Sequence, residues 1–124
     1  MMAQKAALFG DMDTRDRILA TTDPHETKSL GRQAKNFNQE LWLANRASIV
    51  QAGNFAKFSS PTNIHLKQLL LATDDRVLVD ATATDKIWGI GLATTDNDVT
   101  HPEKWPGLNL LGEALMAVRR RLSS

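Results

Sequence analysis

Hydrophobic residues recur every three to four positions along most of the chain, which is the spacing of an amphipathic helix. The pattern predicts a mainly α fold with at most a small β element. Five helices are expected in the first part of the chain, over residues 1–9, 13–20, 24–30, 38–57 and 61–73. A sixth is expected from Leu108 to the final turns. The β-branched run VLV at 77–79 predicts one brief strand.

Local start and stop signals set the ends of these helices. Asp13 or Thr14 can cap the second helix with a side-chain oxygen. The Asp-Pro pair at 23–24 opens the third helix, since proline suits the first helical position. Gly31 is expected to end that helix, and Ser60 is expected to cap the fifth.

The apolar positions also predict which helix faces are buried. The long fourth helix places Trp42, Ile49, Ala52 and Ala56 on one face, which we expect to be buried. Arg119 lies near the end of the last helix, where it is expected to pair with an internal carboxylate. The last helix also carries an aliphatic stripe made of Leu108, Leu111, Leu115, Val118 and Leu122.

The composition fits one small globular domain. Of 124 residues, 42% are hydrophobic, and 15 Lys and Arg residues nearly balance 14 Asp and Glu residues. That balance argues against a dedicated nucleic-acid binder, which carries a strong basic excess. The absence of cysteine excludes disulfides and thiolate chemistry and fits a cytoplasmic protein. No apolar run approaches the roughly 20 residues that cross a bilayer, and no motif predicts a metal site.

Residues 80–107 are rich in turn-forming residues and predict a long ordered loop, which in a compact domain is usually functional. Within it, the sequence TDKIWGIG places Asp85 three residues before Trp88. Gly89 and Gly91 follow directly. A carboxylate, an indole and two flexible backbone points therefore lie within one short segment.

Several motifs together resemble one known family. DKIWGIG at 85–91 and PGLNLLGEALMAVR at 106–119 resemble the C-terminal signature of the YbiA-like (NADAR) family. AQKA near the start, LGR at 30–32, Trp42 within the long helix and AKF at 56–58 follow the order of that family. The resemblance covers essentially the whole chain.

The resemblance implies a compact helical bundle in which residues 1–124 form one domain. Members of the family cleave the bond between ribose 5-phosphate and an aminopyrimidine in early riboflavin-pathway intermediates, and others remove ADP-ribose from guanine bases. We therefore expect an N-glycosidase, a hydrolase that needs no metal or organic cofactor. Its partner is expected to be a small ribosyl-phosphate substrate, with nucleic acid taking part only as an ADP-ribosylated base.

Three residues are predicted to carry the reaction. Cleavage of a ribosyl C–N bond passes through a cation-like sugar, which Asp85 can stabilise. Trp42 and Trp88 can stack on a flat base or favour the cation with their ring faces. The alternative for Asp85 is a turn cap, and the alternative for both tryptophans is a place in the core.

Five further residues are predicted to bind the substrate. Arg32 and Lys5 can hold its phosphate, the arginine through a two-pronged contact. Gly89 and Gly91 let backbone N–H groups approach a ligand closely, and Asn109 completes the set. The alternative for Asn109 is to shape the start of the last helix, and Arg32 can instead be solvated or ion-paired.

The sequence departs from the family at its start. Family members carry a segment before the AQK helix that includes a glutamate with a proposed acid–base role, and this sequence begins at MMAQKA. The expectation is a domain shortened at this end, with Glu26 or Glu40 as the only substitutes. A misassigned start, a fragment of weak activity and a pocket that binds without catalysing all stay open.

Two other classes of function remain alternatives. The same fold can serve as a non-catalytic module that binds ADP-ribose or a ribose phosphate. The basic run at 119–121 also allows a helical nucleic-acid accessory, whose affinity would fall steeply with salt. The near-zero net charge disfavours that last option.

Overall fold

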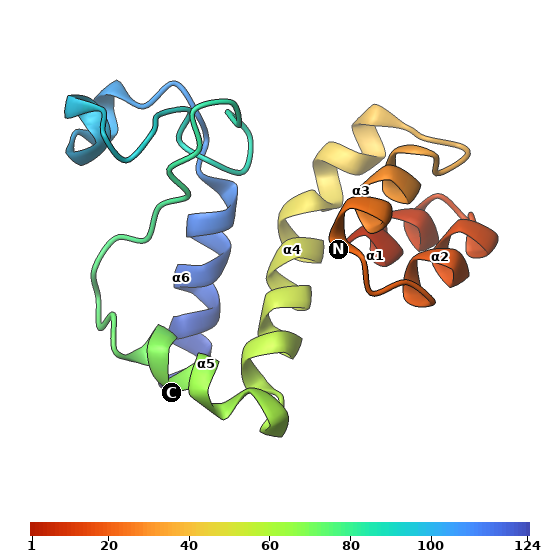
Figure 1. Ribbon diagram of the computed structural model, residues 1–124, viewed down its shortest axis with the longest axis horizontal. Coiled ribbons are helices and arrows are strands. Elements are labelled where there is room, and N and C mark those ends of the chain that lie inside the picture. Colours follow the sequence, from red (N-terminus) through yellow and green to blue (C-terminus); the bar gives the residue numbers. More distant parts are fainter. The chain divides into compact units, whose positions relative to one another are not determined.

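The computed structural model describes residues 1–124 and is mainly helical, as predicted (Figure 1). No residue lies in a β-strand, so the strand predicted at 77–79 is wrong. Three short 3₁₀ helices are η1 (Pro61–Asn63), η2 (Asn97–Thr100) and η3 (Pro102–Lys104). The six α-helices are α1 (Met2–Leu8), α2 (Met12–Leu19), α3 (Pro24–Arg32), α4 (Gln39–Ser59), α5 (Ile64–Leu71) and α6 (Leu110–Leu122).

The chain divides into two compact units, the first over Met1–Val50 and the second over Gln51–Ser124. The boundary between them falls inside α4. Each unit is described by itself below. The single domain expected over 1–124 stays a prediction.

The buried face predicted for α4 is wrong. Ala52 and Ala56 are exposed, Trp42 and Ile49 are half-buried, and Val50 is the buried residue of this helix. The physical reason is that α4 contributes its first half to one unit and its second half to the other. No single apolar stripe therefore serves the whole length of the helix.

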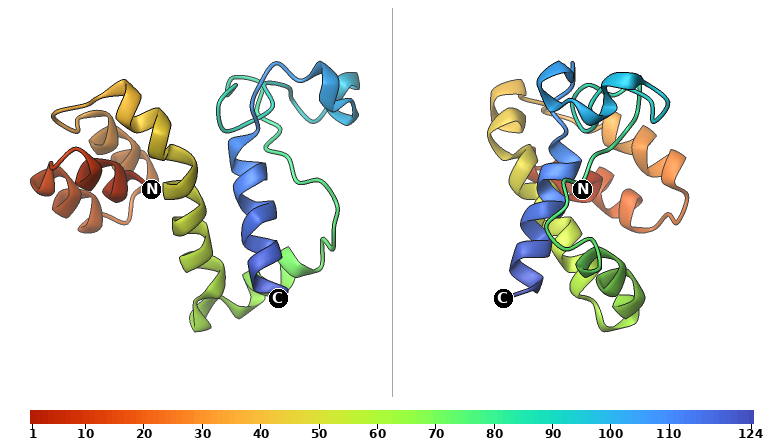
Figure 2. Two further views of the ribbon diagram at one scale, coloured as in Figure 1. Left: turned by 180° about the vertical axis from the view of Figure 1, so that it is seen from behind. Right: turned by 90° about the vertical axis from the view of Figure 1, so that its left-hand side faces the viewer.

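The first unit is built from α1, α2 and α3, which lie side by side (Figure 2). Ala6, Ile18 and Leu30, one from each helix, form its buried core. Gly31 does not end α3 as predicted, because the helix continues past it. A Cβ at Gly31 would meet only the side chain of Met2, which is flexible and can move, and this contact lies where α1 packs against α3.

Asp11 ties three segments of the first unit together. Its carboxylate accepts hydrogen bonds from the backbone N–H of Thr14 at 3.1 Å, the Thr14 hydroxyl at 2.7 Å and the backbone N–H of Lys35 at 2.8 Å. Asp11 is thus the cap of α2, rather than Asp13 or Thr14 as predicted. These hydrogen bonds stabilise the charged form and lower the pKa of Asp11 to about 2.

The second unit is built around α6 and the long loop that precedes it (Figure 2). Ile90 and Val118 are fully buried, at 0% exposure each. Helix α6 begins at Leu110 rather than at Leu108, because Asn109 adopts the left-handed conformation with φ of 55°. Leu108 consequently lies outside the helical stripe and is exposed. The loop over 80–107 is confirmed, with η2 and η3 as its only helical turns.

The segment predicted as a strand is irregular and has no partner strand. The Asn109 side chain binds it instead, with Nδ2 donating to the carbonyl of Leu78 at 2.9 Å and Oδ1 accepting from the N–H of Asp80 at 3.0 Å. A side-chain amide therefore takes the place that a neighbouring strand would fill.

Arg119 is buried, but the carboxylate partner predicted for it is absent. Its Nη1 donates to the hydroxyl of Thr73 at 2.8 Å and to the carbonyl of Arg76 at 2.9 Å. These two acceptors lie just after α5, so Arg119 joins the end of α5 to the last turns of α6.

We predict that Asp11 makes the first unit sensitive to acid. A group whose folded-state pKa is lowered contributes stability that is present above its ordinary pKa and is lost as pH falls through the folded-state pKa. For Asp11 that window runs from 3.8 down to about 2. Thermal unfolding from about pH 6 to about pH 2 should show a wild-type stability advantage over Asp11→Asn that disappears across this window. The exposed neighbour Asp13 offers a control, because the stability of Asp13→Asn should depend on pH as that of the wild type does. A stability difference between wild type and Asp11→Asn that stays constant with pH would contradict the prediction.

Candidate functional site

The two sequence motifs that carry the family resemblance cross each other at the start of α6. The backbone carbonyls of residues 86–90 all accept hydrogen bonds from backbone N–H groups of residues 107–111. The pairs, donor first, are Gly107 to Ile90 at 2.8 Å, Leu108 to Lys86 at 2.9 Å, Asn109 to Gly89 at 2.9 Å, Leu110 to Ile87 at 3.1 Å and Leu111 to Trp88 at 3.0 Å. We call residues 85–91 and 107–111 the crossed loop.

This crossing satisfies groups that a helix otherwise leaves without partners. The first N–H groups of an α-helix have no acceptor within the helix. At α6 the carbonyls of Ile87 and Trp88 accept from Leu110 and Leu111, and no side chain caps the helix. These N–H groups are therefore occupied by the protein itself.

Asp85 and Trp88 lie together at the beginning of the crossed loop. The Oδ1 atom of Asp85 accepts from the N–H of Ile87 at 3.0 Å and from the N–H of Trp88 at 2.8 Å. Both Asp85 and Trp88 are half-buried. Oδ2 makes no hydrogen bond within the protein, so one oxygen holds the turn and the other is free to meet a ligand.

The two glycines of the motif have a packing reason within the protein. A Cβ at Gly89 would stand 2.8 Å from the carbonyl oxygen of Asp80 and 2.9 Å from that of Asp85. Gly91 has φ of +77°, and a Cβ there would stand 2.9 Å from Pro106. These glycines therefore let segments of the protein pack closely against each other, whereas the sequence predicted a close approach to a ligand.

The other predicted binding residues gather in the first unit. The Nζ atom of Lys5 lies 5.2 Å from the ring centroid of Trp42 and 5.4 Å from that of Phe37. Burial, and secondly the positive charge of Arg32, lower the pKa of Lys5. Neither cation forms an ion pair, and Arg32 is exposed. We call Lys5, Arg32, Phe37 and Trp42 the lysine–aromatic cluster.

Phe37 is the residue of this cluster that sequence reasoning missed. It lies within GRQAKNF and is 49% exposed, while its ring meets that of Phe9 edge-on at 5.2 Å between centroids. The available signal was a phenylalanine in a polar segment directly before the long helix. Its place beside Lys5 depends on how α1 packs against the segment after α3, which periodicity does not encode.

The predicted site residues thus form one set in each unit. Lys5, Arg32 and Trp42 belong to the first unit. The second unit holds Asp85, Trp88, Gly89, Gly91 and Asn109.

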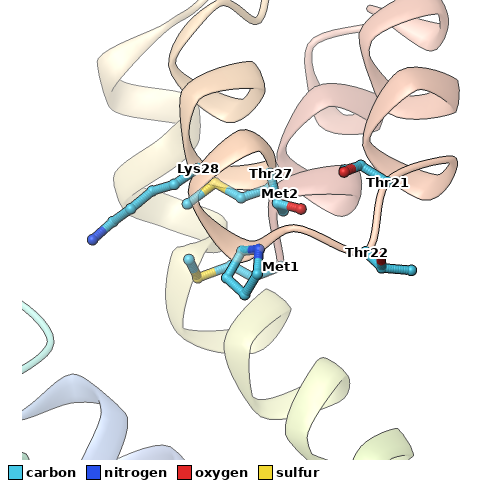
Figure 3. A pocket seen from close by; sticks show the side chains of 7 residues that line it. Met1, Met2, Thr21, Thr22, Thr27 and Lys28 are labelled. Atoms are coloured by element: carbon cyan, nitrogen blue, oxygen red, sulfur yellow. The ribbon is translucent and has the colours of Figure 1, made fainter.

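Two hollows of the structure do not coincide with the predicted site residues. An apolar hollow of about 410 Å³ lies in the first unit between the start of α1 and the α2–α3 connection. Figure 3 shows Met1, Met2, Thr21 and Thr22 around it. None of the predicted site residues lines this hollow. A smaller hollow of about 170 Å³ in the second unit is lined by Leu78, Val79, Asp80, Leu111, Gly112 and Leu115.

The structure contains neither a candidate metal site nor a candidate membrane span. No group of three or more His, Asp or Glu side chains is placed so that it could hold a metal ion. None of the helices combines the length and the apolar character that crossing a bilayer requires.

Comparison with known proteins defines the class of this chain. Residues 1–123 match the NADAR domain. An N-glycosidase of Acanthamoeba polyphaga mimivirus is 47% identical over 120 residues, which are 96% of this chain and 69% of the relative. The N-glycosidase YbiA of Shigella boydii is 28% identical over 96% of this chain and 66% of its own length. The chloroplastic riboflavin biosynthesis protein PYRR of Arabidopsis thaliana is 32% identical over 86% of this chain, but only 16% of that protein.

The chain therefore belongs to the NADAR family, and the resemblance read from its motifs is confirmed. The hydrolase class expected from the sequence is the class to which the N-glycosidase relatives belong. The chain spans about two-thirds of the length of those relatives.

Proposed function

We propose that this protein is an N-glycosidase that hydrolyses the ribosyl C–N bond of a phosphoribosyl-aminopyrimidine or of a related ADP-ribosyl compound. Family membership and relatives named as N-glycosidases support the reaction class. The relative named as a riboflavin biosynthesis protein supports the aminopyrimidine substrate. The observation that carries the proposal is the lysine–aromatic cluster, because its chemistry matches a ribosyl phosphate.

The cluster lacks a negative charge of its own. Burial, and secondly the charge of Arg32, lower the pKa of Lys5, and no carboxylate of the protein pairs with either cation. A phosphate would relieve the repulsion between these two cations, and the planar guanidinium of Arg32 suits a two-pronged contact with its oxygens. The faces of Phe37 and Trp42 would meanwhile offer stacking surfaces to a flat base.

The second unit holds a separate candidate, the carboxylate of Asp85. The free Oδ2 of its carboxylate can stabilise a cation-like sugar or orient the attacking water. The hydrogen bonds to Oδ1 fix its direction, so the carboxylate needs little reorganisation during the reaction. In this route water attacks the anomeric carbon, and the base leaves with its nitrogen protonated.

The place of the Lys5 amine against the rings of Trp42 and Phe37 allows a second route to the same products, in which Lys5 is a nucleophile and Arg32 alone holds the phosphate. A lysine that is desolvated beside another cation is more often neutral and can act as a nucleophile. Its amine can displace the base from C1 of a ring-opened ribosylamine, forming an imine while the base leaves as its amine. Water then hydrolyses the imine, which releases ribose 5-phosphate and restores Lys5.

We predict that the charge of Asp85 is required for turnover. Asp85→Asn keeps an acceptor oxygen for the turn but removes the charge, and the rate of ribose 5-phosphate release from 5-amino-6-(5-phosphoribosylamino)uracil should fall by about 10²–10³. Asp96→Asn is the matched control, because the Oδ1 atom of Asp96 accepts from the N–H of Asp98 in the same way at 2.8 Å. Unchanged turnover in Asp85→Asn would remove Asp85 from the mechanism.

We predict that Lys5 forms a reducible imine with the sugar. Treatment with ribose 5-phosphate and cyanoborohydride should place one covalent adduct on Lys5, located by peptide mass mapping, and Lys5→Arg should abolish it. Lys57→Arg is the control, because Lys57 faces a single ring, that of Phe58, at 5.5 Å. Adducts spread evenly over surface lysines would exclude the amine route and leave water as the nucleophile.

The binding module remains the alternative function. It is favoured if calorimetry detects uptake of ADP-ribose or ribose 5-phosphate while no substrate is turned over. The cytoplasmic location stays a prediction.

A further inference from the structure

Asn109 occupies a position that few residues tolerate. It is 2% exposed and adopts the left-handed backbone conformation, with φ of 55°. Asparagine is among the few residues besides glycine that visit this conformation readily. The position therefore combines a backbone constraint with a buried polar side chain.

All the polar groups of Asn109 are already engaged within the protein. Its side-chain amide donates to the carbonyl of Leu78 and accepts from the N–H of Asp80. Its backbone N–H donates to the carbonyl of Gly89, and its own carbonyl accepts from the N–H of Glu113 at 3.0 Å. Contact with substrate would require one of these buried bonds to break, which disfavours the direct binding role predicted from the sequence.

These bonds hold the crossed loop from two directions. From one side, the backbone N–H of Asn109 binds Gly89 at 2.9 Å. From the other, the carbonyl of Asp80 accepts from the N–H of Ile90 at 2.9 Å, and the Asn109 side chain fixes Asp80 itself. Trp88 directly precedes the segment that is held in this way.

We propose that Asn109 is a positioning residue that fixes the Asp85–Trp88 turn in its reactive geometry. The inference rests on the proposed function for its consequence in catalysis. Asn109 acts through two links: it joins Leu78 and Asp80 to α6, and it anchors Gly89 one residue after Trp88. A displacement of about 1 Å in a reacting group can cost on the order of a hundredfold in rate, so the loss of the side-chain link alone should be visible in turnover.

The chemistry of the position explains why asparagine is required. One side chain must present a donor to Leu78 and an acceptor to Asp80 while the backbone stays left-handed. Aspartate keeps the acceptor but sets a second oxygen against the Leu78 carbonyl. Glycine keeps the backbone conformation but loses both side-chain bonds.

The test compares Asn109→Gly, Asn109→Asp and a control that weakens the same unit elsewhere. Thr73→Val is that control, because it removes the hydroxyl that accepts from Arg119 and leaves the crossed loop intact. The kcat and KM for ribose 5-phosphate release are measured on the full chain, well below each variant's Tm. Amide hydrogen exchange at Ile87 and Trp88 is followed by NMR, which requires no turnover.

Asn109→Gly should lower kcat by about 10–100-fold while KM changes by less than about threefold. The kcat of Asn109→Asp should lie between those of Asn109→Gly and wild type. Exchange at Ile87 and Trp88 should quicken at least about tenfold in Asn109→Gly and remain near wild type in Thr73→Val. Wild-type kcat in Asn109→Gly would overturn the positioning role. If the wild-type protein shows no turnover, the proposed function fails, and the exchange rates decide the positioning role alone: equal rates in the two variants would overturn it.

Discussion

The second unit depends on how the start of α6 satisfies its backbone N–H groups. Carbonyls from residues 86–90 accept from residues 107–111, so two segments separated by the long loop become one hydrogen-bonded structure. Unpaired backbone groups at its buried residues, Gly89, Ile90 and Asn109, would be costly. The crossing accounts for the close packing at Gly89 and Gly91, for the left-handed Asn109 and for the fixed turn that carries Asp85 and Trp88.

In the first unit, one carboxylate accepts hydrogen bonds from backbone N–H groups of two separate segments. Asp11 joins the end of α1, the start of α2 and the segment after α3. The cluster around Lys5 forms on this scaffold, and neither of its two cations has an ion-pair partner.

Features that depend on neighbouring residues could be predicted from the sequence. Features that depend on contacts between segments far apart in the chain could not. The Asp-Pro start of α3 was predicted correctly because the cap and the proline act locally. Gly31 carries the local signal of a helix end, yet α3 continues to Arg32, and its contact with Met2 of α1 comes from packing between helices. VLV at 77–79 has the composition of a strand, yet the amide of Asn109 takes the partner's place. Asp85 and Trp88 were visible as a motif, whereas Phe37 and the engagement of Asn109 required the tertiary structure.

Scalar couplings across hydrogen bonds, measured by NMR on the isotopically labelled chain, test the crossed loop most directly. The predicted result is a correlation between the nitrogen of Asn109 and the carbonyl carbon of Gly89, and another between Leu111 and Trp88. Both pairs should also show slow amide exchange. Absent correlations together with the rapid exchange of an unstructured segment would contradict the crossing, and with it the reason that Asp85 and Trp88 are held in place.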